Sequence, residues 1–187
     1  MPSTDLADLL SRLEAQWRTH QLPIADHLRP GVDEIALKAR LAERGIVPPR
    51  EVVTWFGWHD GCSDIQFSEA ISYGWLMTLD DALTAYDTHV NADPEADQHC
   101  WLPIIDRAGD YIVVRCHEDS PDLAMTSSVD ETATVLPPQW WQPSLAVPVQ
   151  WWIEKFETRT WEKGPTGRIM NHGYKDVDRH QVITELL

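Results

Sequence analysis

Apolar residues near the start of the chain recur every three or four positions, the spacing of one face of an α-helix. The positions on that face are Leu6, Leu9, Leu10, Leu13 and Trp17. Thr4 stands just before them and is the expected N-cap, and Asp5 and Asp8 lie where the positive end of the helix dipole favours acids. We therefore predict an amphipathic helix that ends before Pro23.

Four more helices are expected from similar spacing and from their capping residues. They span about residues 33–43, 49–56, 79–86 and 144–156. Gly45 follows the first of these, and glycine readily adopts the left-handed conformation that ends a helix. Thr78, with Asp81 three residues later, is typical of an N-terminal capping arrangement, and Ser144 is a candidate cap for the last helix.

Two apolar runs around a short polar segment predict a β-hairpin. The runs are residues 101–105 and 111–116, and Gly109 between them suits a positive φ. If Asp106 faces Asp110, the register places apolar side chains together on one face of the sheet. The facing pairs are then Leu102 with Val114, Ile104 with Ile112, and Cys100 with Cys116. A strand within residues 127–136 and a short one within residues 65–77 are also expected.

The acidic residues are concentrated in the middle of the chain. The 187 residues include 15 Lys and Arg against 30 Asp and Glu, a formal net charge of −15. Residues 61–136 hold 15 of these acids and only 2 of the bases. A chain of this charge repels nucleic acid and anionic lipid, so we expect neither as a partner. The middle segment is either a solubilising surface or a face that attracts a basic protein.

Other features of the composition argue against a membrane or secreted protein. No stretch approaches the roughly 18 apolar residues needed to span a bilayer. The first residues lack a basic cluster followed by an apolar run, which is the pattern of a secretory signal. The 3 cysteines, an odd number, do not make a disulfide scaffold. We therefore expect a cytoplasmic protein.

Several motifs follow one another in an order that is known from a protein superfamily. They are LRPGVDEIALKARLAERGIVPP (residues 28–49), WFGWHDG (55–61), GWLMTLDDALTAY (74–86) and WLPIIDRAGDYIVV (101–114). The first motif has a Pro-Gly pair and acidic residues at the expected start of a helix, and the second has aromatic residues before an Asp-Gly pair that predicts a turn. The last motif has a Leu-Pro pair in an expected strand that continues into the hairpin. In this order the chain resembles the SUKH superfamily, which includes bacterial immunity proteins against polymorphic toxins and fungal cell-wall assembly regulators.

The resemblance implies an α+β domain, with helices packed on a mostly antiparallel sheet, that works by binding another protein. It covers the SUKH-like domain expected over residues 1–160, and residues 161–187 are then a loosely attached C-terminal extension. The family is not known as a class for catalysis, so no catalytic residue and no cofactor carries over. The expected function is that of an immunity protein that binds and occludes a basic toxin domain. The alternative is a regulatory scaffold without a toxin partner.

Candidate contacts for a basic partner are acidic residues of the middle region and two tryptophans that lie next to prolines. Acidic side chains can stand in for phosphate at a basic surface, and tryptophan is enriched at interface hot spots. The candidates are Asp60, Asp64, Glu69, Asp93, Glu95, Asp97, Trp140 and Trp141. The alternative for the 10 tryptophans of the chain is that they fill the core.

Cysteine and histidine occur together three times, which raises the question of a metal site or a nucleophile. The combinations are His59 with Cys62, His99 with Cys100, and Cys116 with His117. Neighbouring side chains in a strand point to opposite faces, so the four hairpin residues cannot converge on zinc without distortion. We expect no metal site. A base, its orienting acid and a nucleophile are the alternative interpretation of His59, Asp60 and Cys62.

Overall fold

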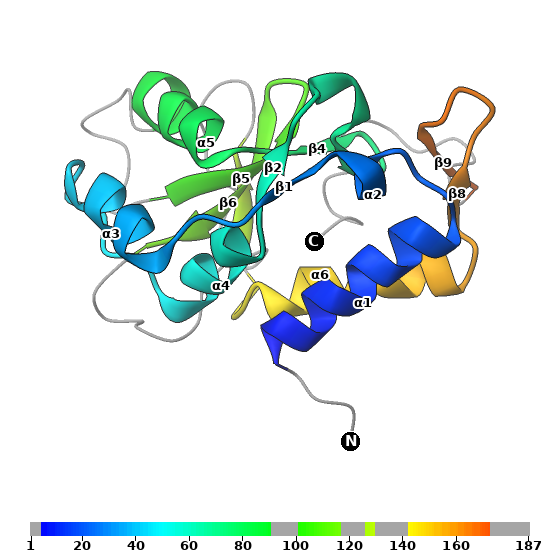
Figure 1. The fold of residues 1–187 in the computed structure, drawn as a ribbon, viewed down its shortest axis with the longest axis horizontal. Coiled ribbons are helices and arrows are strands. Elements are labelled where there is room, and N and C mark those ends of the chain that lie inside the picture. The colour runs from blue at the N-terminus through cyan, green and yellow to red at the C-terminus, as the bar shows by residue number, and fades with distance from the viewer. Residues whose placement is uncertain (1–4, 91–100, 117–125, 130–141, 173–187) are drawn as a thin grey trace.

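The computed structural model describes residues 5–90, 101–116, 126–129 and 142–172, which form an α+β fold (Figure 1). The helices are α1 (Leu6–Thr19), α2 (Ile24–His27), α3 (Glu34–Ala42), α4 (Arg50–Trp58), α5 (Leu79–Ala85) and α6 (Ala146–Glu157), with a 3-10 turn η1 (Ile65–Phe67) and a π-helical turn η2 (Tyr86–Val90). The strands are β1 (Leu28–Pro30), β2 (His59–Cys62), β3 (Glu69–Ile71), β4 (Gly74–Leu76), β5 (Trp101–Arg107), β6 (Asp110–Arg115), β7 (Thr126–Val129), β8 (Trp161–Lys163) and β9 (Ile169–Asn171).

The five predicted helices are present, and short polar side chains cap several of them. The cap of α1 is Asp5, whose carboxylate accepts the backbone N–H of Ala7 at 3.1 Å, so the prediction of Thr4 was wrong. Asp33 caps α3, and Thr78 caps α5 as predicted. Each of these caps accepts a backbone N–H that the first turn of the helix leaves without an intrahelical partner.

The central sheet has the strand order β3-β4-β5-β6-β7, and every neighbouring pair is antiparallel. The predicted hairpin is present as β5 and β6, and the facing of Leu102 and Val114 is confirmed. A bulge in β5 shifts the register by one residue toward the turn. Beyond it the pairs are Ile105 with Ile112 and Asp106 with Tyr111, in place of the predicted Ile104–Ile112 and Asp106–Asp110 pairs. Cys100 lies outside the described residues.

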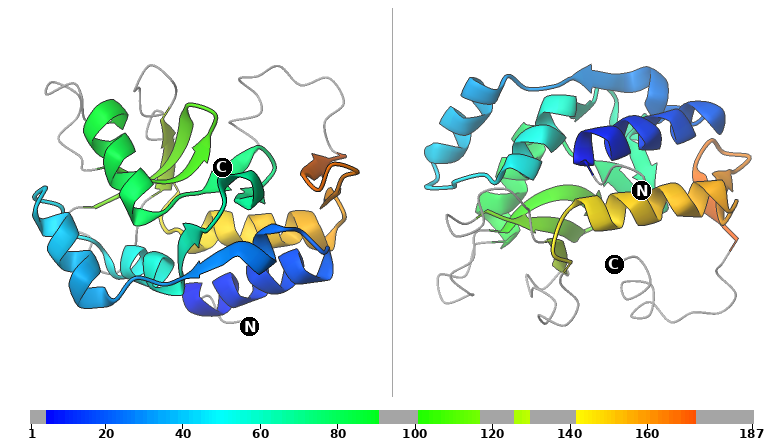
Figure 2. Two further views of the ribbon diagram at one scale, coloured as in Figure 1. Left: turned by 45° about the horizontal axis from the view of Figure 1, so that its top comes forward. Right: turned by 90° about the horizontal axis from the view of Figure 1, so that it is seen from below.

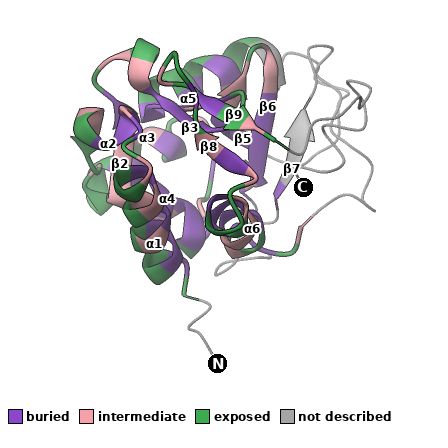
Figure 3. Cartoon of the chain, turned by 90° about the vertical axis from the view of Figure 1, so that its right-hand side faces the viewer, coloured by how far each residue is buried: buried purple, intermediate pink, exposed green. Residues whose placement is uncertain are grey.

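The helices pack around this sheet on different sides. Helices α1 and α6 lie side by side, and α5 lies at the opposite end of the molecule, with the sheet between (Figures 1 and 2). Trp17 of α1 reaches β3, where its indole N–H donates to the carbonyl of Ala70 at 2.9 Å. Buried positions lie on the inner side of α6 and along the strands that it faces (Figure 3). These elements share one connected apolar core.

The segment after α6 is part of this core. Strands β8 and β9 form an antiparallel hairpin, in which Trp161 is fully buried and Ile169 is 5% exposed. The Trp161 ring packs edge-on against Phe156 of α6, with 5.4 Å between the ring centroids. The expectation of a loosely attached extension over residues 161–187 is therefore wrong as far as residue 172, and residues 173–187 lie outside the described part of the chain.

The predicted strand within residues 127–136 begins as β7, and its remainder lies outside the described residues. Residues 65–77, predicted as loop and a short strand, contain η1 and two short strands, β3 and β4. None of the described helices is both long and apolar enough to cross a bilayer.

Candidate protein-binding site

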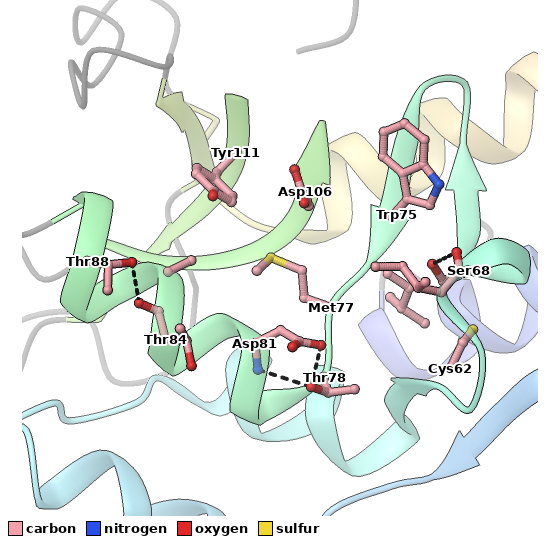
Figure 4. A pocket seen from close by; sticks show the side chains of 13 residues that line it. Cys62, Ser68, Trp75, Met77, Thr78, Asp81, Thr84, Thr88, Asp106 and Tyr111 are labelled. Atoms are coloured by element: carbon pink, nitrogen blue, oxygen red, sulfur yellow. Dashed lines mark hydrogen bonds between the residues drawn. The ribbon is translucent and has the colours of Figure 1, made fainter. Parts of the chain in front are cut away.

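A hollow of about 240 Å³ opens between α5 and the strands β4, β5 and β6 (Figure 4). We call it the α5 groove. The described residues that line it all lie between Cys62 and Tyr111, within the acidic middle segment. Leu76, Met77 and Ala85 are buried and give the groove an apolar floor. The groove therefore combines an apolar floor with lining residues from the most acidic part of the chain.

One wall of the groove is a row of side chains across three strands. Trp75 of β4 faces Asp106 of β5, and Asp106 faces Tyr111 of β6, so the three side chains lie on the same face of the sheet. Burial, and then the charge of Asp106, raise the pKa of Tyr111. The Tyr111 hydroxyl therefore keeps its proton at neutral pH, and Asp106 is the charged member of the row.

Helix α5 presents acidic residues on two faces, and only one of these faces is neutralised. Asp80 forms an ion pair with Arg40 of α3. Asp87, in the following turn η2, pairs with Arg44 at 2.8 Å. Asp81 faces the groove instead, and in the described part of the chain no lysine, arginine or histidine pairs with it or with Asp106. The groove lining thus carries two carboxylates and, among the described residues, no cationic group.

The hydroxyl groups that line the groove each donate their proton to an acceptor within the protein. The hydrogen bonds are Thr78 Oγ1 to Asp81 Oδ2 at 2.7 Å, Thr84 Oγ1 to the Asp80 carbonyl at 2.8 Å, Thr88 Oγ1 to the Thr84 carbonyl at 2.7 Å, and Ser68 Oγ to the Ile65 carbonyl at 2.8 Å. A hydroxyl has a single proton, so each of these four oxygens has only lone pairs left for a ligand. Among the described lining residues, the other side-chain N–H, O–H and S–H groups are those of Trp75, Tyr111 and Cys62, which are neutral.

Asp60 and Gly61, predicted to form a turn, lie instead in strand β2 and position the beginning of α5. Asp60 Oδ1 accepts the backbone N–H of Leu79 at 2.7 Å, and its Oδ2 forms an ion pair with Arg29 at 3.0 Å. Gly61 has a φ of 66°, and a Cβ atom there would lie 2.7 Å from the backbone nitrogen of Thr78. Only glycine fits so close an approach in this conformation. Asp60 and Gly61 of β2 thus fix the first residues of α5, including the cap beside Asp81.

Three of the predicted contact residues can be placed, and two of them have internal roles. Asp60 is held by Leu79 and Arg29, with a side chain that is 14% exposed. Glu69 is buried, and its two oxygens accept the backbone N–H groups of Tyr73 and Ile169, so it offers no exposed surface to a partner. Asp64 caps η1 at the edge of the groove and is partly exposed. The remaining candidates, Asp93, Glu95, Asp97, Trp140 and Trp141, lie outside the described residues.

His59, Asp60 and Cys62 do not form a connected catalytic group. The ring nitrogens of His59 contact the Arg29 carbonyl at 2.8 Å and the Glu14 carboxylate at 3.2 Å, while Asp60 has the partners given above. Cys62 lines the groove, and burial raises the pKa of its thiol to about 12. At neutral pH such a thiol is protonated and a poor nucleophile.

No cluster of metal-binding side chains occurs within the described ranges. Cys116 is buried in the core, where its thiol donates to the Val114 carbonyl at 3.8 Å, in keeping with its interpretation as a small core residue. Its three predicted companions, His99, Cys100 and His117, are not among the described residues.

Most of the described tryptophans serve the core. Five of them are at most 1% exposed: Trp17, Trp55, Trp101, Trp152 and Trp161. Trp58, Trp75 and Trp151 are partly exposed, and of these Trp75 lines the α5 groove. The partly exposed Trp75 is thus the described ring best placed to meet a ligand.

Sequence reasoning missed the two carboxylates of the groove, Asp81 and Asp106. Both had been assigned local tasks, in a helix cap and in a hairpin turn, and both do perform them: Asp81 accepts from Thr78, and Asp106 accepts the N–H of Gly109 at 3.2 Å. The bulge in β5 is the reason that Asp106 faces Tyr111, and it leaves no clear signal in the sequence.

A scan of protein-family models finds no match to this chain, and a search of curated proteins finds none.

Proposed function

We propose that this chain is a cytoplasmic immunity protein that neutralises a cognate toxin by binding a basic domain of it and occluding the toxin's working surface. The observation that carries the proposal is the α5 groove, which has two carboxylates and no cationic group in its described lining. The resemblance of the sequence to the SUKH superfamily supports the same class of function.

The charge of the groove favours a basic partner over an acidic one. A concave site lined by one sign of charge, with apolar walls, concentrates the field and attracts ligands of opposite charge. The protein as a whole is acidic, with a net charge of −15, so the long-range field has the same sign as the groove. Complementary fields raise the rate of encounter and penalise wrong partners.

Occlusion requires contacts beyond the groove, and an apolar residue is exposed at its edge. Ile65 of η1 lines the groove and is 76% exposed. Exposed apolar residues beside charged ones provide the area that holds a partner after electrostatic encounter.

Co-expression with the protein encoded beside this chain tests the proposal. The neighbouring protein is expected to arrest bacterial growth when it is produced alone, and this chain is expected to restore growth. Asp81→Lys reverses a charge in the groove and should abolish protection. Asp26→Lys reverses an exposed charge on α2 and should leave protection intact. A harmless neighbour, or equal protection by the two variants, would refute the proposal and would favour a scaffold without a toxin partner.

The salt dependence of binding tests the electrostatic part separately. Charges in solvent are screened beyond about 8 Å at physiological ionic strength. The association rate with the purified toxin should therefore fall steeply as salt rises from about 50 to 300 mM, while dissociation changes less. A flat association rate would remove electrostatic steering from the mechanism.

A further inference from the structure

We propose that the α5 groove receives one arginine side chain of the partner protein. This inference rests on the proposed function and specifies the chemical group that the groove recognises. The groove, of about 240 Å³, is smaller than the pockets of about 300–1,000 Å³ that hold drug-sized ligands. A single long side chain that enters from a partner surface suits a hollow of this size.

The hydrogen-bonding groups of the groove call for a ligand rich in donors. The hydroxyl oxygens of Thr78, Thr84, Thr88 and Ser68 offer only lone pairs, because each proton is already donated to a carbonyl or carboxylate of the chain itself. Asp81 and Asp106 add carboxylate oxygens. A phosphate or carboxylate would meet lone pairs at all of these positions, whereas a guanidinium group has five N–H donors and no acceptor.

The carboxylates and rings favour a planar cation over a compact one. Asp81 and Asp106 lie on different elements, α5 and β5, so the negative charge is spread over two walls of the groove (Figure 4). A guanidinium directs donors in several directions at once, and it also stacks on aromatic faces such as those of Trp75 and Tyr111. A lysine ammonium is more strongly hydrated and loses more on entering a partly apolar hollow.

The floor of the groove suits the aliphatic part of the same side chain. Leu76, Met77 and Ala85 are at most 6% exposed and present apolar atoms. Arginine buries its methylene groups on apolar surface while its charged head contacts polar groups. In this arrangement the methylenes cover Met77 and the head lies between Asp81 and Asp106.

Titration with N-acetyl-arginine methylamide, followed by the methyl resonances of ¹³C-methionine, tests the inference. Met77 lies in the groove, and Met170 on β9 is 42% exposed and serves as the internal control. The Met77 resonance should shift in a saturable manner while that of Met170 stays fixed. N-acetyl-citrulline methylamide, which is neutral and nearly the same shape, should bind at least about tenfold more weakly.

Charge-removing variants complete the test. Asp81→Asn and Asp106→Asn keep an oxygen for their internal hydrogen bonds and should each weaken arginine binding about tenfold. Asp26→Asn should not weaken it. The thermal midpoint of each variant verifies that it is folded. Three results would overturn the inference: equal binding of the arginine and citrulline derivatives, tighter binding of the corresponding lysine derivative, or a Met77 resonance that does not shift.

The two proposals fail in different ways. If the chain protects against its toxin but Met77 does not respond to arginine, the immunity function stands and arginine recognition is wrong. If Met77 responds to arginine but the neighbouring protein is neither toxic nor bound, the groove is an arginine site and the immunity function is wrong.

Discussion

The carboxylate of Glu69 on β3 accepts the backbone N–H of Ile169 on β9 at 2.9 Å and joins the central sheet to the C-terminal hairpin. Its second oxygen accepts the N–H of Tyr73, a residue with a φ of 57° in the turn between β3 and β4. Burial raises the pKa of Glu69, against the opposing effect of these two hydrogen bonds and of the charge of Arg168. One side chain therefore holds both a strained turn and the last hairpin.

Removal of this carboxylate should destabilise the fold. Glu69→Ala leaves two backbone donors without their acceptor, and the expected loss in the free energy of unfolding is about 2 kcal/mol. Urea denaturation followed by tryptophan fluorescence measures it. Glu43→Ala, which removes a carboxylate that is 72% exposed, should change stability by less than about 0.5 kcal/mol. Similar losses in the two variants would contradict the role assigned to Glu69.

The N-terminus of α6 should be sensitive to Ser144. Its hydroxyl donates to Glu51 of α4 and accepts the N–H of Ala146 at 3.0 Å, and Glu51 also accepts the N–H of Leu145 at 3.0 Å. Leu145, and not Ser144 as predicted, is the N-cap of α6. Ser144→Ala still removes the acceptor of the Ala146 N–H and leaves a buried carboxylate oxygen with one donor fewer. The expected cost is about 1–2 kcal/mol. Ser144→Thr, which retains the hydroxyl, should recover most of it in the same denaturation assay.

Glu14 should protect the folded state against acid. Desolvation raises the pKa of its carboxyl, but hydrogen bonds from Arg18, His59 and Trp58 outweigh this effect and hold the pKa below its usual 4.5. When folding lowers the pKa of a carboxyl, the charged group stabilises the folded state at every pH above its pKa in the unfolded chain. This stabilisation is lost as the pH falls through the lower pKa of the folded protein.

Glu14→Gln should therefore be less stable than the parent chain at pH 7, and the difference should disappear as the pH falls below 4.5. Urea unfolding at a series of pH values measures the difference. A difference that is independent of pH would mean that the charge of Glu14 is not what stabilises this contact between α1 and β2.

Cys62 should resist alkylation in the folded protein. With a pKa of about 12, its thiolate fraction at pH 8 is about 10⁻⁴, roughly a thousandfold below that of a thiol with the ordinary value of 9.0. Iodoacetamide followed by peptide mass spectrometry should show slow labelling of Cys62 in the folded chain and rapid labelling in guanidinium chloride. Rapid labelling under native conditions would restore Cys62 as a candidate nucleophile.

The local elements could be predicted because their signals are local. The apolar stripe that ends at Trp17 predicts α1, and the capping pair Thr78 and Asp81 predicts α5. The same was true of the hairpin as an element. Its register depended on a bulge at Ile104, and no glycine or other turn residue marks that position in the sequence.

The candidate site was harder to predict because it depends on contacts distant in sequence. Glu69 is an ordinary acidic residue in the sequence, and only its hydrogen bond to Ile169, 100 positions later, shows that it is internal. Residues 161–187 were expected to be loosely attached, but the burial of Trp161 and Ile169 and the hydrogen bond from Ile169 to Glu69 hold the described part of this segment on the fold.

Arg40 of α3 and Arg44 just after it offer a way to tune recognition without changing the recognition surface. Arg40 neutralises Asp80 on the outer face of α5, and Arg44 neutralises Asp87 in η2. Both ion pairs lie outside the groove lining, but their charges contribute to the electrostatic field that a ligand meets. Replacement of either arginine by glutamine would unmask a negative charge behind the groove and speed the arrival of a cationic ligand, with every contacting atom left unchanged. Related chains could thus adjust how fast they capture a partner separately from which partner they accept.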